Sequence, residues 1–488
     1  MSATPDHDLE IVTGPFAPTW ESLRQFQCPD WFRDAKLGFW SHWGPQSVPM
    51  YGDWYARNMY IEGHAQYLHH WRVYGHPSKT GYKDIIRLWK AEKFDPEALM
   101  RRFVAAGGKY FVGQAMHHDN FDNFDSAHNP WNSTRVGPMR DIVGEWRAAA
   151  KAHGLPFGLS EHLGASFNWF TVNKGSDSSG PYAAVPYDGN DPAYEDLYYR
   201  NQGYTLEKDG EWRWYTDNQP FHRHWFARIK DVIDKYQPDL LYSDGGVAFG
   251  EIGLRIIAHL YNTSAQRNGG VNQAVYNQKD PDPDVYTLGV LDIERGQRDT
   301  IAESPWQTDT SVGDWFYNVR DVYKKPGHVL EMLVDIVSKN GNLLLDIPQR
   351  PDGSLDDECE HLLTRMAAWM EPNGEGIFGS RPWKIASEGP SLLKPATRYD
   401  EPALAWSAAD FRFTQKGEMI YAYQMRWPEG GQTTIRALAS GQGSRVAQVN
   451  LLGYGSVAFE QHDEGLQIAL PQWKPAEGPH GFAVVLGG

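Results

Sequence analysis

Short apolar runs alternate with amphipathic stretches over residues 31–347 of the chain. The apolar runs are typical of buried parallel strands, which are hydrophobic at consecutive positions because both faces are covered. The amphipathic stretches have a helical period and recognisable ends, such as Asp95 and Pro96 at the start of one helix and Gly154 after another. Strands are predicted at 37–44, 109–119, 156–162, 239–246, 274–278 and 342–348, and helices at 94–108, 137–154, 221–237 and 328–341.

This strand–helix alternation predicts an α/β fold, a (β/α)₈-like (TIM) barrel. A doubly wound sheet is the alternative, but no glycine-rich phosphate-binding motif follows the first strand. Residues 171–215 are rich in Gly, Ser, Asp, Asn and Tyr and have no clear period. They are interpreted as a long insertion in the barrel that borders its cleft.

The pattern changes after residue 376, where five short β-type segments follow one another with turn residues between them. This arrangement predicts a C-terminal antiparallel β-sandwich. The sequence therefore predicts two domains, the barrel over residues 1–375 and the sandwich over 376–488.

The composition excludes several classes of protein. The net charge of -16 disfavours binding to a phosphate backbone, so no nucleic-acid partner is expected. No apolar run reaches the roughly 20 residues that span a bilayer. The N-terminus as given has no signal-peptide pattern, so the compartment stays open; secretion or export to the periplasm is plausible if a signal was removed. The oligomeric state is equally open.

The chain contains 20 tryptophans, 25 tyrosines and 21 phenylalanines. Indole rings offer a flat apolar face with one N–H donor, which suits the C–H faces and hydroxyl groups of sugars. The alternative interpretation is that these rings only fill a large core.

The chemistry of a TIM barrel lies at the carboxyl ends of its strands. The predicted strand ends supply His42, the pair His117–His118, His162 and Asp244, and a further apolar stretch leads to Glu294. Asp244 is the sharpest candidate, because it ends an apolar run and is followed by two glycines. An aspartate there can be a nucleophile, a base or a metal ligand, or it can simply cap the next helix.

Two alternatives follow from these residue types. Asp244 with Glu294 or Glu303 would supply the two carboxyl groups that glycoside hydrolysis requires. His117, His118 and Asp119 could instead bind a metal ion, although adjacent residues of a strand point in opposite directions and no H-x-H spacing occurs at a strand end. We therefore expect no metal and no cofactor.

Several strings, in order over residues 28–385, resemble the α-L-fucosidases of glycoside hydrolase family twenty-nine. They are WFRDAKLGFWSHWGPQSVP (31–49), GDWYARNMY (52–60), HHDNFDNFDS (117–126), PDLLYSDGG (238–246), GNLLLDIPQRPDGSL (341–355) and NGEGIFGSRPW (373–383). The resemblance implies a retaining exo-glycosidase that removes terminal α-L-fucose from an oligosaccharide or glycan, built from a (β/α)₈-like barrel and a C-terminal β-sandwich.

The resemblance also implies roles for single residues. Asp244 matches the nucleophile; the substrate-binding set would be His42, Asp53, Trp54, Tyr55, His117, His118, His162 and Trp306. Asp53 stands where the family usually has Glu, and Lys279 stands near the place of a family arginine.

The acid/base residue is the main departure from the family pattern. Many members have a glutamate directly after a tryptophan, but here the string is Trp306–Gln307, and glutamine cannot donate a catalytic proton. The expected acid/base is therefore Glu294, with Glu303 second. A non-catalytic fucose-binding protein and a metal-dependent barrel hydrolase stay open as alternatives.

Overall fold

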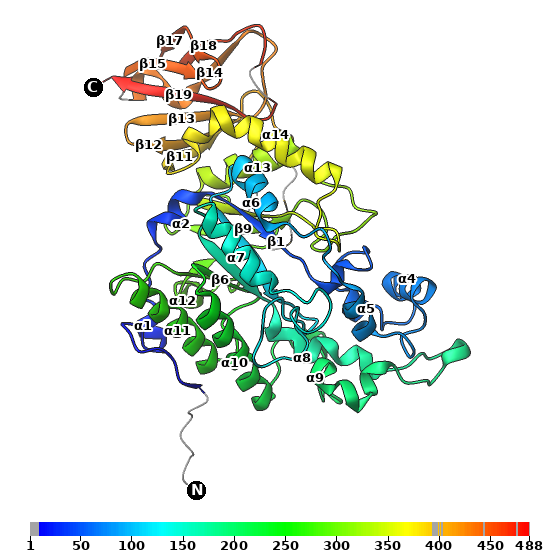
Figure 1. Ribbon diagram of the computed structural model, residues 1–488. Coiled ribbons are helices and arrows are strands. Elements are labelled where there is room, and N and C mark those ends of the chain that lie inside the picture. Colours follow the sequence, from blue (N-terminus) through cyan, green and yellow to red (C-terminus); the bar gives the residue numbers. More distant parts are fainter. Residues whose placement is uncertain are drawn as a thin grey trace.

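The computed structural model describes residues 9–392, 399, 401, 404–442, 445–474 and 477–487. Its first part is a nearly closed barrel of eight parallel strands in the order β8-β7-β6-β3-β2-β1-β10-β9 (Figure 1). A parallel bridge between Asp292 and Gln307 links the two outer strands. The strands are β1 (Leu37–Ser41), β2 (Tyr110–Met116), β3 (Phe157–Glu161), β6 (Leu240–Ser243), β7 (Val275–Gln278), β8 (Val290–Leu291), β9 (Trp306–Ser311) and β10 (Gly341–Asp346).

Helices cover the outside of the barrel and bury its apolar face (Figure 1). Their ends follow the sequence signals; for example, the carboxylate of Asp95 accepts a hydrogen bond from the amide of Ala98 and caps α6. The main helices are α6 (Pro96–Ala105), α7 (Ile142–Ala152), α10 (Gln219–Tyr236), α11 (Glu251–Arg267), α13 (Pro326–Ser338) and α14 (Asp357–Asn373). Shorter helices are α1 (Trp20–Leu23), α2 (Asp30–Ala35), α3 (Tyr55–Asn58), α4 (Ala65–Val73), α5 (Tyr82–Leu88), α8 (Ser166–Trp169), α9 (Glu195–Tyr198) and α12 (Pro283–Tyr286).

The predicted barrel is confirmed, and β8 and β9 are the two strands that the pattern missed. β9 reads WQTDTS, and all six of its residues are buried although most are polar. The strand has no apolar run, because its polar side chains are buried through hydrogen bonds to other parts of the barrel, as between Gln307 and Tyr110 and between Asp309 and Tyr242. Among the described helices, none combines the length and apolar character needed to cross a bilayer.

The C-terminal part is a β-sandwich, as predicted. A six-stranded sheet in the order β11-β12-β13-β19-β15-β16 faces a three-stranded sheet, β14-β18-β17 (Figure 1). Its strands are β11 (Arg381–Glu388), β12 (Phe411–Lys416), β13 (Met419–Gln424), β14 (Gln432–Ile435), β15 (Arg445–Leu451), β16 (Gly455–Ser456), β17 (Phe459–His462), β18 (Gly465–Ala469) and β19 (His480–Gly487).

A single turn of 3₁₀ helix, Gly374–Gly376, separates α14 from β11. We propose the boundary between residues 375 and 376 in this turn, because the strands that follow it belong to the second sheet system. The connection from β11 to β12 returns to the barrel, where Lys324 forms an ion pair of 2.9 Å with Glu401.

The two parts are joined by a buried ion pair. Arg412 of β12 donates from Nε to Asp335 of α13, and both side chains are 2% exposed. The second oxygen of Asp335 is 2.7 Å from the Nζ of Lys339. A buried carboxylate that loses such a partner keeps most of its desolvation cost.

Replacing Arg412 with alanine is expected to lower the free energy of unfolding by about 3 kcal/mol, because Asp335 would stay buried beside Lys339 alone. Thermal and denaturant unfolding of the full chain measures this. Arg436→Ala, at an exposed position of the sandwich, is the matched control and should change stability little. Equal stability of the two variants would contradict this account of the interface.

Candidate active site

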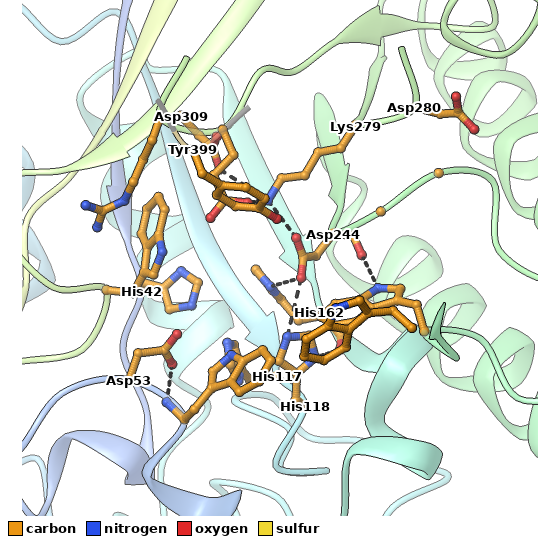
Figure 2. Close-up of a pocket in the computed structure, with 18 of the residues that line it drawn as sticks. His42, Asp53, His117, His118, His162, Asp244, Lys279, Asp280, Asp309 and Tyr399 are labelled. Carbon is orange, nitrogen blue, oxygen red and sulfur yellow. Dashed lines mark hydrogen bonds and ion pairs between the residues drawn. The ribbon is translucent and has the colours of Figure 1, made fainter. Parts of the chain in front are cut away.

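A pocket of about 820 Å³ opens at the carboxyl ends of the barrel strands. Side chains on or just after seven of the eight barrel strands, and others from the 171–215 insertion, converge on it (Figure 2). It is lined by Trp40, His42, Asp53, Trp54, His117, His118, His162, Trp212, Trp214, Tyr215, Asp244, Gly245, Gly246, Lys279, Asp280, Pro281, Glu294, Arg295, Asp309, Trp315 and Tyr399.

Asp244 directly follows β6 and is held at the centre of the pocket (Figure 2). One carboxylate oxygen, Oδ1, is 2.7 Å from the Nζ of Lys279. The other, Oδ2, is 3.3 Å from Nε2 of His118 and 3.4 Å from Nδ1 of His162. Each oxygen therefore faces a nitrogen that fixes its direction.

The loop behind Asp244 is clamped by the 171–215 insertion. Trp214 donates from Nε1 to the carbonyl oxygen of Asp244 at 3.1 Å, and the hydroxyl of Tyr215 donates to the carbonyl oxygen of Gly246 at 3.1 Å. Gly245 has φ +137°, and a Cβ atom there would lie 2.3 Å from the hydroxyl oxygen of Tyr215. The glycine therefore lets the insertion approach the backbone that carries the carboxylate.

Lys279 connects Asp244 with a second carboxyl group. Its Nζ lies 2.5 Å from an oxygen of Glu294, and it is 3.7 Å from Oδ2 of Asp309 on β9. All these side chains are almost fully buried. Asp309 also accepts a hydrogen bond of 2.8 Å from the hydroxyl of Tyr242. One cation thus stands among three carboxyl groups.

The surroundings separate the pKa values of the two acids. Burial opposes ionisation of Asp244, but Lys279, His162 and His118 together hold the pKa of its carboxyl group well below the usual range. Burial raises the pKa of Glu294, with further contributions from Asp309 and Asp244, and Lys279 opposes the rise. Two neighbouring carboxyl groups with opposite shifts are the usual basis for one nucleophile or base and one acid.

Three buried histidines of the pocket, His42, His117 and His162, have lowered pKa values and are neutral. Burial lowers the pKa of His42 and of His117 well below the ordinary value, and it lowers that of His162 to about 4. Within the described part of the chain, neither ring nitrogen of His42 nor Nε2 of His162 has a hydrogen-bond partner. Buried polar atoms normally have partners, so these nitrogens indicate a polar ligand in the pocket.

Asp53 and Trp54 enter the pocket from the loop before α3 (Figure 2 shows Asp53 opposite Asp244). Burial, together with Asp314, raises the pKa of Asp53 well above its ordinary value. Its Oδ1 accepts a hydrogen bond of 2.6 Å from the amide of Trp54. Trp54 lies near Trp214, with ring centroids 6.4 Å apart. Aromatic rings therefore line the pocket beside its carboxyl and imidazole groups.

Three of the residues expected in the site lie outside the pocket lining. Tyr55 is the first residue of α3, and its hydroxyl bonds to His69 at 2.9 Å. Trp306 is buried against the barrel wall, where its Nε1 donates to the carbonyl oxygen of Lys339 at 2.9 Å. Glu303 is exposed in the connection before β9. None of these three side chains therefore lines the pocket.

Gln307, the residue after Trp306, does not face the pocket. The absence of a glutamate at this position therefore leaves the carboxyl groups of the pocket unchanged. The amide of Gln307 is fully buried inside the barrel, where it accepts from Tyr110 at 2.7 Å and donates to Asp292 at 2.6 Å. The departure from the family string therefore changes the barrel interior rather than the group facing a ligand.

Sequence reasoning missed other lining residues, notably Asp309, Trp212, Tyr215 and Tyr399. The rule that found Asp244 also applies to Lys279, which follows β7 directly. Asp309 had no such signal because its strand was not recognised. Tyr399 comes from the connection between β11 and β12, and its amide donates to the carbonyl oxygen of Glu294 at 3.0 Å.

Among the residues that the structure describes, two groups of side chains have ligand atoms close enough to hold a metal ion. They are His42, His117 and His162, and separately His118, His162 and Asp244, with all atoms of a group within 4.8 Å of one another. Asp119 belongs to neither group, since its carboxylate accepts from Tyr82 at 2.5 Å. The predicted combination of His117, His118 and Asp119 is therefore not the one that this geometry brings together.

Comparison with known proteins identifies the family to which the chain is similar. The sequence model of the family described as alpha-L-fucosidase matches residues 5–375, and that of the alpha-L-fucosidase C-terminal domain matches residues 407–487. A tissue alpha-L-fucosidase from Rattus norvegicus is 29% identical over 479 residues, covering 95% of this chain and 90% of the relative. The corresponding Homo sapiens protein is 27% identical over 481 residues, covering 96% and 90%.

The solved structure of a Thermotoga maritima alpha-fucosidase in complex with fucose has the same fold. Its TM-score is 0.73 at 23% sequence identity, and the match covers 96% of this chain and all of that chain. With a family match over most of its length and a pocket built around paired carboxyl groups, the chain belongs to the α-L-fucosidase family and is a glycoside hydrolase.

Proposed function

We propose that the protein is a retaining exo-α-L-fucosidase of glycoside hydrolase family twenty-nine, with Asp244 as nucleophile and Glu294 as acid/base. Its substrate would be a terminal α-L-fucosyl residue of an oligosaccharide or glycan. His42, His117, His118 and His162 would bind the sugar hydroxyls, and Trp54 would cover an apolar face of the ring.

The shared contact with Lys279 carries this proposal. Oxygens of Asp244 and Glu294 lie 2.7 and 2.5 Å from the same nitrogen. Their separation therefore does not exceed the spacing of about 5–5.5 Å between the carboxyl groups of retaining glycosidases, and it is well below the roughly 6.5–9.5 Å of inverting ones. The short spacing leaves room for a covalent intermediate and none for a water molecule behind the sugar.

In the first step the Asp244 carboxylate attacks C1 of the fucosyl group, and Glu294 gives its proton to the departing glycosidic oxygen. In the second step Glu294, now a carboxylate, takes a proton from water, which attacks C1 and releases Asp244. Ester formation removes the charge of Asp244, one of the charges that raise the pKa of Glu294. The pKa of Glu294 therefore falls as its role changes from acid to base.

The proposal is tested by following hydrolysis of a fucosyl disaccharide by NMR. A retaining enzyme first releases α-L-fucose, which then equilibrates with the β anomer. Initial release of the β anomer would contradict the double displacement. No turnover would instead support the non-catalytic alternative.

Because two groups of histidines could hold a metal ion, a metal-dependent reaction is the alternative to this mechanism. For the group that contains Asp244 we favour histidines that act through hydrogen bonds, because Lys279, a cation, already contacts Asp244 at 2.7 Å and would repel a metal ion beside it. Overnight dialysis against EDTA should then leave kcat/KM unchanged. A loss restored by Zn²⁺ would support the metal-dependent alternative.

The pH dependence of activity follows from the opposite pKa shifts of Asp244 and Glu294. Activity should rise as pH increases through the low pKa of Asp244, which must be ionised, and fall as pH increases through the raised pKa of Glu294, which must be protonated. Asp309→Asn removes a charge that raises the pKa of Glu294, so the basic limb of kcat/KM should move to lower pH. A basic limb that stays in place, or moves upward, would contradict the assignment of that limb to Glu294.

A further inference from the structure

Two exposed aromatic side chains stand at the mouth of the pocket. Trp212 is 60% exposed and Tyr399 is 64% exposed, and both line the cavity. The other strongly exposed aromatic residues among the described ones, Trp20, Tyr204, Tyr454 and Trp473, do not line it. Large aromatic rings left open to water beside a cavity commonly mark a binding surface.

Trp212 is held at this position by a built structure. It ends β5 (Glu211–Trp212), which pairs with β4 (Glu207–Lys208) in a hairpin of the 171–215 insertion. Its ring lies 6.3 Å from that of Trp54, edge to face. Trp214, two residues later, donates to the carbonyl oxygen of Asp244. The segment that contacts the backbone of Asp244 through Trp214 therefore also carries Trp212 into the lining of the cavity.

Asp280 adds a polar group to the lining of the cavity. Asp280 follows Lys279, and Figure 2 shows it on the side away from His42. Its Oδ1 accepts a hydrogen bond of 3.0 Å from the amide of Asp282, and its Oδ2 lies next to Gly246. Trp212 and Asp280 line the same cavity. An apolar ring together with a carboxylate suits a second sugar ring, which has C–H faces and hydroxyl groups.

We propose that Trp212, Tyr399 and Asp280 form a binding site for the sugar from which fucose is released. This inference rests on the proposed function, because that sugar leaves through the mouth only if fucose binds at the floor. The substrate class is then a fucosylated oligosaccharide in which a pyranose ring carries the fucose. Trp212 packs on an apolar face of that ring, and Asp280 accepts a hydrogen bond from one of its hydroxyls.

The test compares two substrates that differ only beyond the fucosyl group. α-L-Fucosyl fluoride has no second sugar, whereas fucosyl disaccharides of several linkages fill the mouth. In Trp212→Ala the ratio of kcat/KM for the best disaccharide to that for the fluoride should fall roughly 3- to 10-fold. Trp212→Phe should recover part of the ratio. Trp473→Ala, an equally exposed tryptophan of the sandwich, should leave it unchanged.

The outcomes separate the two proposals. An unchanged ratio in Trp212→Ala overturns the sugar site, because Trp212 would then act only through the rest of the pocket. Wild-type turnover of the fluoride with none of any disaccharide also overturns it, and the proposed hydrolysis of the fucosyl bond stands. Failure of the wild type on every substrate overturns both.

Discussion

Asp244→Asn should reduce kcat by at least about 10⁴-fold, because an amide of nearly the same shape cannot attack C1. The folded protein should persist, since asparagine keeps an acceptor oxygen toward Lys279 and the backbone contacts with Trp214 do not change. Initial rates on an aryl α-L-fucoside, with thermal unfolding alongside, measure both expectations. Asp299→Asn, at an exposed position, is the matched control and should behave as wild type.

A smaller side chain at position 244 allows rescue. In Asp244→Gly, azide can occupy the space of the carboxylate and attack C1 from that side. The expected product is the β-fucosyl azide, formed with an activated aryl fucoside in proportion to azide concentration. Turnover of Asp244→Asn close to that of wild type would remove Asp244 from the nucleophile role.

Glu294→Ala should affect substrates according to their leaving groups. A fucosyl disaccharide needs a proton on the departing oxygen, so its kcat/KM should fall about 10²- to 10⁴-fold. The first step with an activated aryl fucoside needs little protonation and should change far less. The basic limb of the pH profile should also flatten, because the group that titrates there is gone.

Glu303→Ala is the control for Glu294, because Glu303 was the second candidate and lies exposed outside the pocket lining. It should retain wild-type kinetics on both substrates. Asp53 is the other pocket carboxyl group with a raised pKa. If Asp53→Ala, rather than Glu294→Ala, shows the leaving-group dependence, the acid/base role belongs to Asp53.

Much of the fold could be predicted because its signals are local. Asp95 caps α6 with its carboxylate and Pro96 is the first residue of that helix. The apolar run before Asp244 is β6. The rule that parallel strands present chemistry at their carboxyl ends then placed Asp244, His42 and the other histidines in one region before any contact was known.

The rest of the site depended on contacts that no local pattern reveals. β9 was missed because Gln307 and Asp309 are buried by pairing with other polar groups rather than by being apolar. Tyr399 reaches the pocket from a connection within the C-terminal part of the chain. Lys279 was visible at a strand end, but its bridge between Asp244 and Glu294 exists only in three dimensions.

Trapping the covalent intermediate tests the central proposal most directly. A 2-deoxy-2-fluoro-α-L-fucosyl fluoride should form an ester with the enzyme and release fluoride, because the 2-fluorine slows hydrolysis of the ester. We expect peptide mass spectrometry to find one fluorofucosyl group per chain, attached to Asp244 and absent from the Asp244→Asn variant. A label on another carboxylate, or turnover through a product of inverted configuration without any label, would contradict the proposal.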